Sequence, residues 1–456
     1  MCLEILLSIA AVVVKDIKRY GWSVLCFCLF LTGLGQVLAV SAAEMPNAPM
    51  TLKDCVATAL QLNPSLKRNV EAVKEAEASY AMARAAIFPK FSLSAYQNHL
   101  NGDRLGSMTA SQANLYERED YAGLSAKQLL FDGGKTLAEQ RAAEYSADAE
   151  RVNLQITEVD VVMRVKQAFY RVLEAQELVR VAEEAVRRQK AFEELTKAFF
   201  EAGKATRLDL LKAESQTMDA RKTLAAIQET ARLSLVYLKA VIGLDMNQEI
   251  TVNGVLPVFD QNTLTASLEA LWTSNVLDVN PDIRHLEVAL KAAGEDVTAK
   301  KRAWFPELSL QGAYAYRDRD IGGGADEWQL GAFLSWPVFD GGLRAGDLRR
   351  SEARYNNIRY ARRELELNMT SQVKEAVSAM KTAASNAEAA LKLVEKEKEA
   401  CSAADALYRA GKATSLDVLT ANADLTKARG DYVQALAAYA VSKARFERLT
   451  AKELER

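Results

Sequence analysis

The sequence predicts a mostly α-helical protein with a small β part, built from long antiparallel helical hairpins and four short strands within an internal twofold repeat. Three observations support this fold class. The 456 residues include only eight prolines, so long stretches of the chain have no backbone breaker. Four short motifs occur twice in the same order. Two pairs of segments alternate between apolar and polar residues with the period of two that is typical of a β-strand.

The composition excludes several classes of protein. Lys and Arg number 58 against 60 Asp and Glu, for a formal net charge of -2, so the sequence lacks the strong positive charge of a nucleic-acid binder. Hydrophobic residues make up 49% of the chain, which argues against disorder. Two histidines and five cysteines leave little material for a metal site. We therefore expect no nucleic-acid partner, no metal, no cofactor and no catalytic residues, and predict that the protein is not an enzyme.

Residues 1–43 have the pattern of an export signal. A basic cluster at Lys15–Arg19 is followed by an apolar run from Trp22 to Val40 and by the small residues Ser41-Ala42-Ala43. About 20 apolar residues can also span a bilayer, so a single membrane anchor is the alternative interpretation. The small residues at the end of the run favour cleavage after Ala43. Cys55 and Cys401 would then be the cysteines that remain, and we expect packing roles for them.

The internal repeat divides the remaining chain into residues 51–250 and residues 262–456. Its motifs lie at nearly constant spacing, which chance hardly produces four times in order. The pairs are Asn63-Pro64-Ser65-Leu66 with Asn280-Pro281-Asp282-Ile283, Phe88-Pro89 with Phe305-Pro306, Phe131-Asp132-Gly133-Gly134 with Phe339-Asp340-Gly341-Gly342, and Ala202-Gly203-Lys204-Ala205-Thr206 with Ala410-Gly411-Lys412-Ala413-Thr414.

Each repeat is predicted to contain a helix, a β-hairpin and a long helical hairpin. A helix of about 35 residues should run up to the Phe-Pro step, because proline cannot continue it. The β-hairpins are expected at 88–131 and 305–339, with strands of about ten residues. Neither Gly nor Pro occurs in 135–202 or 347–410, so each of these segments is predicted to be one helix of roughly 100 Å. The chain should turn back near Gly203 and Gly411.

The strands suggest a membrane-spanning barrel. About ten residues are the length of a tilted transmembrane β-strand, and alternation gives such a strand one lipid face and one lumen face. Every backbone group in lipid must be hydrogen-bonded, so an open four-stranded sheet cannot lie there. Closure needs about eight strands or more, which requires several chains; three would give twelve strands. The alternative is two soluble hairpins packed on the helices.

The chain resembles the TolC-like outer membrane efflux proteins. The resemblance extends from Thr51 to about Lys452 and is carried by the Phe-Pro and Phe-Asp-Gly-Gly motifs, by the twofold Gly-x-x-x-x-Leu-Asp turn and by the duplication itself. It implies a homotrimer whose shared twelve-stranded transmembrane β-barrel lies in the outer membrane, surrounded by lipid, and continues into the periplasm as a trimeric α-helical barrel.

The implied partners are a periplasmic adaptor (membrane fusion) protein and an inner-membrane transporter. The implied function is a passive outer-membrane exit duct of a tripartite efflux or secretion system, which carries small molecules or secreted proteins. The resemblance does not identify the cargo. A periplasmic coiled-coil structural or adaptor protein is the alternative function, and the two β-hairpins argue against it.

Two sets of site residues follow from the turns. Thr206 with Asp209, and Thr414 with Asp417, fit capping boxes at the start of a helix. The resemblance implies that the turns dock the adaptor, through Ala202, Gly203, Lys204, Ala410, Gly411 and Lys412. It also implies a periplasmic gate formed by Asp209, Tyr408 and Asp417.

The two Asp residues of this gate allow two interpretations. In a trimer, six carboxylates would come close to one axis and bind multivalent cations. The alternative is that both residues only cap their helices. The family's basic gate residue and second acidic residue correspond here to Ala413 and Thr420, so a thinner gate network is expected.

Overall fold

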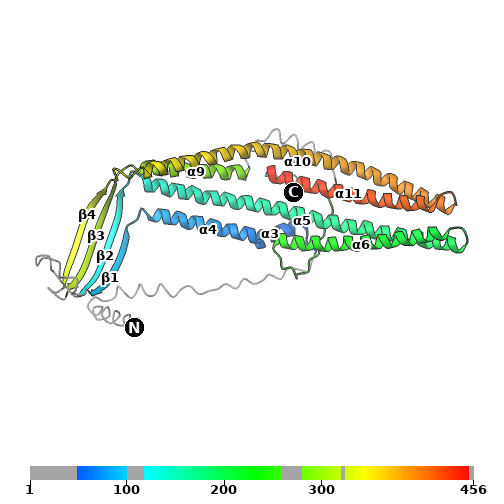
Figure 1. The fold of residues 1–456 in the computed structure, drawn as a ribbon, viewed down its shortest axis with the longest axis horizontal. Helices are drawn as coiled ribbons and strands as arrows, with labels where there is room; N and C mark the ends of the chain where they lie inside the picture. The colour runs from blue at the N-terminus through cyan, green and yellow to red at the C-terminus, as the bar shows by residue number, and fades with distance from the viewer. Residues whose placement is uncertain (1–48, 100–117, 259–279, 320–323, 451–456) are drawn as a thin grey trace. The chain divides into compact units, whose positions relative to one another are not determined.

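The computed structural model describes residues 49–99, 118–258, 280–319 and 324–450. The predicted export signal lies outside the described residues. The described part is mostly helical with one four-stranded sheet, as Figure 1 shows, which confirms the predicted fold class.

The predicted first helix of about 35 residues is wrong, because the chain forms two helices there. These are α3 (Leu52–Leu62) and α4 (Pro64–Ala85), separated at Asn63. Pro64 has no N–H to continue α3, and its fixed φ suits the first position of a new helix. The Asn63 side chain caps that helix by accepting the Ser65 N–H at 2.9 Å, while its Nδ2 donates to the Val241 carbonyl at 2.6 Å. The break therefore ties the start of α4 to a helix far along the chain.

The second repeat uses the same device. Helix α9 (Pro281–Arg302) begins after Asn280, whose side chain accepts the Asp282 N–H at 2.8 Å and donates to the Leu449 carbonyl at 3.0 Å. A single Asn-Pro step thus sets both the start of the helix and its anchor in each repeat.

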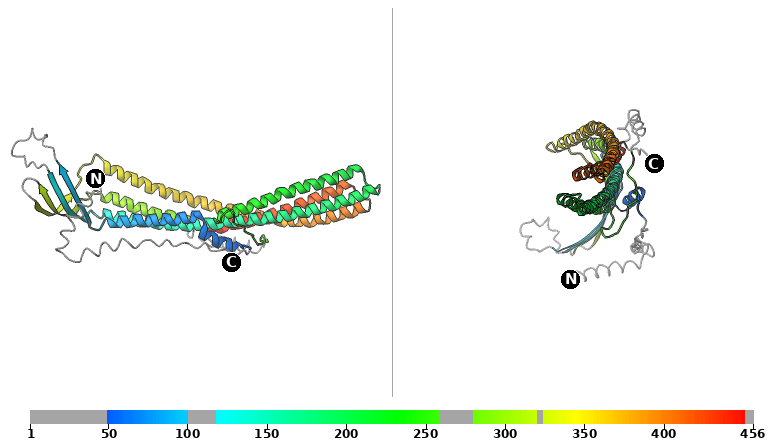
Figure 2. Two further views of the ribbon diagram at one scale, coloured as in Figure 1. Left: turned by 90° about the horizontal axis from the view of Figure 1, so that it is seen from below. Right: turned by 90° about the vertical axis from the view of Figure 1, so that its right-hand side faces the viewer.

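Two helices of 67 residues dominate the structure. Helix α5 (Lys135–Glu201) turns back into α6 (Arg207–Ile242), and α10 (Leu343–Arg409) turns back into α11 (Ser415–Thr450). We call α5 with α6 the first hairpin and α10 with α11 the second hairpin. Helix α5 also packs against α4, α9 and α11, so it joins the two hairpins (Figures 1 and 2). None of the helices in the described ranges is long and apolar enough to cross a bilayer.

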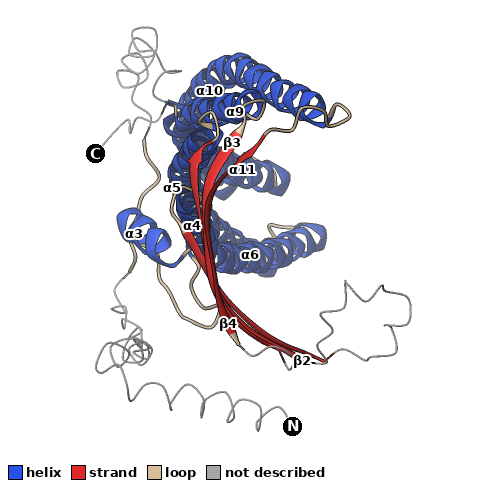
Figure 3. Ribbon diagram, turned by 90° about the vertical axis from the view of Figure 1, so that its left-hand side faces the viewer, coloured by secondary structure: helices blue, strands red, loops and turns tan. Residues whose placement is uncertain are grey.

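The two β-hairpins join into one antiparallel sheet. Strands β1 (Lys90–His99), β2 (Arg118–Phe131), β3 (Glu307–Arg319) and β4 (Ala325–Ser335) pair in the order β1-β2-β3-β4, so β1 and β4 are the edges (Figure 1). Figure 3 shows the same sheet in red, seen close to edge-on. Strand β4 was expected to reach position 339 but ends at Ser335. Pro337 follows two residues later and has no N–H for the ladder.

The Phe-Asp-Gly-Gly motif makes the step from strand to helix. The Asp132 carboxylate accepts the N–H groups of Gly134 at 2.9 Å and Thr136 at 2.7 Å, and thereby caps the start of α5. Gly133 has a φ of 68°, and a Cβ added there would lie 2.5 Å from the Cβ of Phe305. Only glycine satisfies both conditions without strain. The motif recurs because the same junction occurs twice.

The largest core cluster lies where α3, α5, α6 and α11 meet. Cys55, Val165 and Leu238 are fully buried in it, and Phe169 lies beside them. Burial raises the pKa of the Cys55 thiol to about 11, so this thiol stays protonated and serves as an apolar packing group.

Gly243, which ends α6, offers a stability test. Its φ is 91°, and an added Cβ would lie 2.9 Å from the Leu62 carbonyl oxygen. Gly243→Ala is therefore expected to lower the free energy of unfolding by about 2 kcal/mol. Gly346→Ala is the matched control, because that position lies inside α10 with nothing within 4 Å of the added Cβ, and it should gain about 0.5 kcal/mol. Denaturant unfolding followed by circular dichroism measures both, and equal stability of the two variants would contradict the expectation.

Candidate functional site

The strand register separates the sheet into an apolar and a polar face. Residues directly opposite one another project to the same side of the sheet. Leu93 lies opposite Leu124, Leu124 opposite Tyr314, and Tyr314 opposite Trp328. The neighbouring rows on this face are mostly apolar, with Gln128 and Asp326 as polar members, and include Phe91, Ala95, Ala122, Ala126, Leu310, Gly312, Tyr316, Leu330, Ala332 and Leu334.

The other face carries polar and charged groups. Ser92 lies opposite Ser125, and their hydroxyl oxygens are 2.7 Å apart. Lys127 lies opposite Gln311 on the same face and forms an ion pair with Glu307 at 3.5 Å. Arg317 forms an ion pair with Glu119 at 3.2 Å. This arrangement gives one side that suits lipid and one side that suits water.

The apolar face and both edges of the sheet are uncovered in a single chain. Leu93 on the edge strand β1 and Trp328 on the edge strand β4 are 79% and 77% exposed. Among the described residues, β1 pairs with β2 alone and β4 with β3 alone. Unpaired edges beside an exposed apolar face are stable only when another strand and an apolar medium cover them.

The turns between the long helices are exposed glycine caps. Gly203 and Gly411 have φ values of 70° and 71°. Each follows its helix as a left-handed residue, and the next N–H returns to the helix: Lys204 to the Phe199 carbonyl at 2.7 Å, and Lys412 to the Leu407 carbonyl at 2.8 Å. We call residues 202–206 the first tip and 410–414 the second tip. A Cβ at either glycine would meet nothing within 4 Å, and Ala202, Lys204, Ala410 and Lys412 are exposed.

Both predicted capping boxes are present. In the first, the Thr206 hydroxyl oxygen accepts the Asp209 N–H at 3.2 Å, and the Asp209 carboxylate accepts the Thr206 N–H at 3.1 Å. In the second, the corresponding distances for Thr414 and Asp417 are 3.3 and 2.8 Å. Both Asp residues therefore cap their helices, whereas the carboxylate ring and the interpretation that they only cap stay predictions.

The two Asp residues differ in one contact. The Ser415 hydroxyl of the second hairpin donates to Oδ1 of Asp209 in the first hairpin, so Asp209 also joins the two hairpins. This bond and the one from Thr206 hold the pKa of Asp209 below its ordinary value. Asp417 is exposed, and its pKa is lowered by the Thr414 hydrogen bonds. Ser415 was not among the residues expected at this site, because its partner lies in the other repeat.

Tyr408 lies inside the structure of the tips. Its side chain is 7% exposed, and its ring centroid is 5.2 Å from that of Phe192 and 5.6 Å from that of Phe199. Val418 and Leu419 complete this cluster. In a single chain, Tyr408 therefore packs α10 against α5.

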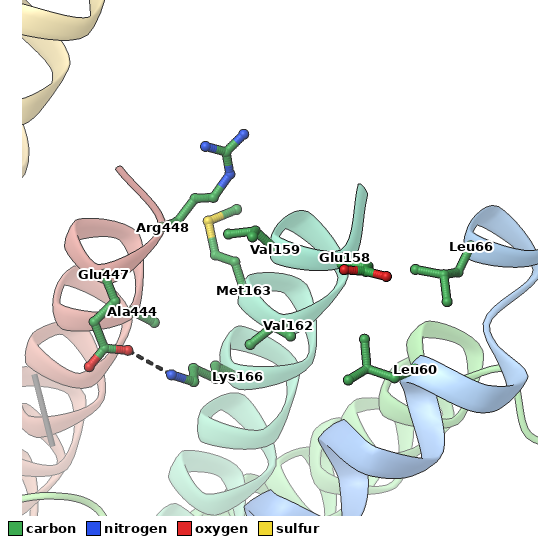
Figure 4. Close-up of a pocket in the computed structure, with 10 residues that line it drawn as sticks. All are labelled: Leu60, Leu66, Glu158, Val159, Val162, Met163, Lys166, Ala444, Glu447 and Arg448. Carbon is green, nitrogen blue, oxygen red and sulfur yellow. Dashed lines mark hydrogen bonds and ion pairs between the residues drawn. The ribbon is translucent and has the colours of Figure 1, made fainter. Parts of the chain in front are cut away.

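A pocket of about 430 Å³ lies among α3, α4, α5 and α11 (Figure 4). Its charged groups include the ion pair between Lys166 and Glu447, which are 2.7 Å apart. Arg448, on its rim, forms ion pairs with Asp160 at 2.5 Å and Asp282 at 2.8 Å. These contacts hold the helices together. Within the described part of the chain, no group of three or more His, Cys, Asp or Glu side chains could hold a metal ion.

Comparison with known proteins gives a family match over most of the chain. The family described as outer membrane efflux protein matches residues 55–244 and 272–452, two segments that fall within the two predicted repeats.

Individual relatives agree with this match over nearly the whole length. Nodulation protein T of Rhizobium leguminosarum bv. trifolii is 23% identical over 90% of this chain and 87% of its own. The outer membrane efflux protein BepC of Brucella suis is 25% identical over 89% of this chain and 87% of its own. The crystal structure of the Campylobacter jejuni CmeC outer membrane channel is 18% identical, covers 90% of both chains and has a TM-score of 0.79, which shows the same fold.

Proposed function

Since the chain belongs to the outer membrane efflux protein family and is an outer-membrane exit duct that extends into the periplasm, we propose that it works as a homotrimer. The three sheets form one twelve-stranded barrel, in which β4 of each copy pairs with β1 of the next. The six helical hairpins form the tunnel that continues the barrel.

The two-faced sheet is the observation that supports this assembly. Its apolar face, from Leu93 to Trp328, is the lipid side, and its polar face with Lys127 and Arg317 lines the lumen. Twelve strands satisfy both edges and enclose a water-filled passage, whereas four strands cannot close. Strands of 10 to 14 residues have the length that a tilted membrane crossing needs.

The tips supply the contacts at the other end of the duct. We assign adaptor docking to the exposed Gly203 and Gly411 with the neighbouring Ala202, Lys204, Ala410 and Lys412. The adaptor connects the duct to an inner-membrane transporter, which supplies the energy. Asp209 and Asp417 form the gate, and Tyr408 supports it from within the helix packing. The duct acts by opening a passage and not by catalysis, and its cargo is small molecules or secreted proteins.

The mass of the protein in detergent tests the proposal. Native mass spectrometry of outer-membrane extract should give three protomers, and the assembly should conduct ions in a planar bilayer. Trp328→Asp places a charge on the lipid face and should cost about 1 to 2 kcal/mol in the membrane, which reduces the amount of assembled trimer. Gln329→Asp, one residue away on the polar face, is the control. A monomer that conducts, or equal loss in both variants, would contradict the proposal.

A further inference from the structure

We propose that Arg207 of one protomer forms an ion pair with Asp417 of the next protomer, so that the tips of neighbouring copies are joined as Ser415 and Asp209 join the two hairpins within one copy. The inference rests on the proposed homotrimer and identifies the contact that holds its gate closed between copies.

The internal repeat makes Arg207 the counterpart of Ser415. Each follows the capping Thr as the first residue of its helix, in α6 and α11. Asp209 and Asp417 are likewise counterparts, because each is the third residue of the same helix and closes the same capping box.

The ring of hairpins then predicts the second contact from the first. Within one chain, the first residue of α11 donates to the third residue of α6, through Ser415 and Asp209. In a trimer, first and second hairpins alternate around the ring, so the second hairpin of one copy lies beside the first hairpin of the next. If the same relation holds at that junction, Arg207 of the next copy lies beside Asp417.

The helix faces agree with this arrangement. Successive residues of an α-helix are about 100° apart, so Arg207 and Asp209 lie on opposite sides of α6. Asp209 faces the second hairpin of its own chain through Ser415, and Arg207 therefore faces away from it. In α11, Ser415 is buried and Asp417 is exposed, which gives the same two-sided arrangement.

A neighbouring apolar contact points to the same surface. Leu419, four residues after Ser415, is only 8% exposed because the first hairpin covers it. Its counterpart Leu211, four residues after Arg207, is 49% exposed. Met218 continues the same face of α6 and is also exposed. We call Arg207, Leu211 and Met218 the outer face of α6. This outer face corresponds to a surface of the second hairpin that is covered within one chain. The outer face itself is exposed in one chain, and a second copy of the protein covers it.

The charges on the two surfaces are complementary. Arg207 is exposed, and its guanidinium has no hydrogen-bond or ion-pair partner among the described residues. Asp417 accepts the Thr414 N–H and hydroxyl through Oδ2, at 2.8 and 2.7 Å, and within the described ranges Oδ1 carries no bond. A guanidinium also reaches farther than a serine hydroxyl, so it can bridge neighbouring copies that lie farther apart than the two hairpins of one chain. An exposed ion pair weakens in salt, so this junction should loosen as ionic strength rises.

Cross-linking of engineered cysteines tests the contact directly. Arg207→Cys with Asp417→Cys, in a Cys401→Ser background, should give covalent dimers and trimers on a denaturing gel after treatment with a short bifunctional thiol reagent. Lys212→Cys with Asp417→Cys is the matched control, because position 212 lies about 140° around α6 from position 207. The control pair should stay monomeric on the gel.

Charge reversal tests the function of the pair. Arg207→Glu and Asp417→Arg should each raise the open probability of the purified channel about fivefold at low salt, and the double variant should return it toward the parent value. Arg221→Glu, at an exposed position of α6 that lies 14 residues beyond Arg207, should change it little. Native mass spectrometry of every variant reports the trimer separately. Trimers that show neither the cross-link nor the recovery would overturn the ion pair and leave the proposed function standing, whereas monomers throughout would overturn both.

Discussion

Trp at both tips is expected to abolish export while the trimer still assembles. Gly203 and Gly411 are exposed and have open space around the missing Cβ, so the indole of Gly203→Trp and Gly411→Trp projects outward, where the adaptor should dock. A bulky ring in a well-packed interface removes complementarity over the whole contact. We expect export, measured as resistance to an effluxed toxic compound in a strain that lacks its own duct, to fall to background.

Strain at the substituted positions needs its own control. Both glycines have left-handed φ values, so a side chain there costs on the order of 1 kcal/mol per residue. Gly341 has a φ of 65°, also with nothing within 4 Å of an added Cβ, but it lies at the opposite end of α10. Gly341→Trp carries the same backbone strain far from the tip and should keep export. Export that persists with both tips altered would show that the adaptor docks elsewhere.

The long helices could be predicted from the sequence because nothing in it interrupts them. Helix α5 ends one residue before the predicted Ala202, and α10 begins four residues before the predicted Asp347 because Gly346 is accommodated inside its first turns. The break at Asn63-Pro64 was missed although the proline was visible. Asn63 anchors to Val241, a contact across 178 residues that no local pattern shows.

The candidate site was predictable only in its local parts. The glycine caps and the capping boxes depend on residues within five positions of each other, so Gly203, Thr206 and Asp209 were recognised from their spacing. The bond from Ser415 to Asp209 joins residues 206 positions apart. This bond depends on how the two hairpins pack. The repeat suggested that they lie side by side, but it does not show which residues of the two hairpins face each other.

The bond between Ser415 and Asp209 should control how easily the gate opens. Ser415→Ala removes the donor and leaves a half-buried carboxylate oxygen without a partner, at a cost of about 1 kcal/mol after solvent screening. We expect the open probability of single channels to rise about fivefold. Ser442→Ala is the control, since it removes a hydroxyl that donates to the Ala438 carbonyl within α11 and does not join the hairpins, and it should leave the open probability unchanged.

The pH dependence of the channel distinguishes a gate held by the bond between Ser415 and Asp209 from a gate formed by a ring of repelling carboxylates. The Ser415 and Thr206 bonds lower the pKa of Asp209, so their stabilisation is complete above the unfolded pKa near 4 and is lost as pH falls through the lower folded value. Open probability should therefore stay constant from pH 8 to about 5 and rise only below about 4, and Ser415→Ala should shift that rise to higher pH.

Six unpaired carboxylates would instead raise one another's pKa, so the open probability would change at higher pH. They would also bind multivalent cations strongly. Two results would therefore favour the ring over the hydrogen-bonded gate: an open probability that changes between about pH 5 and 7, and block by multivalent cations that Asp417→Asn relieves.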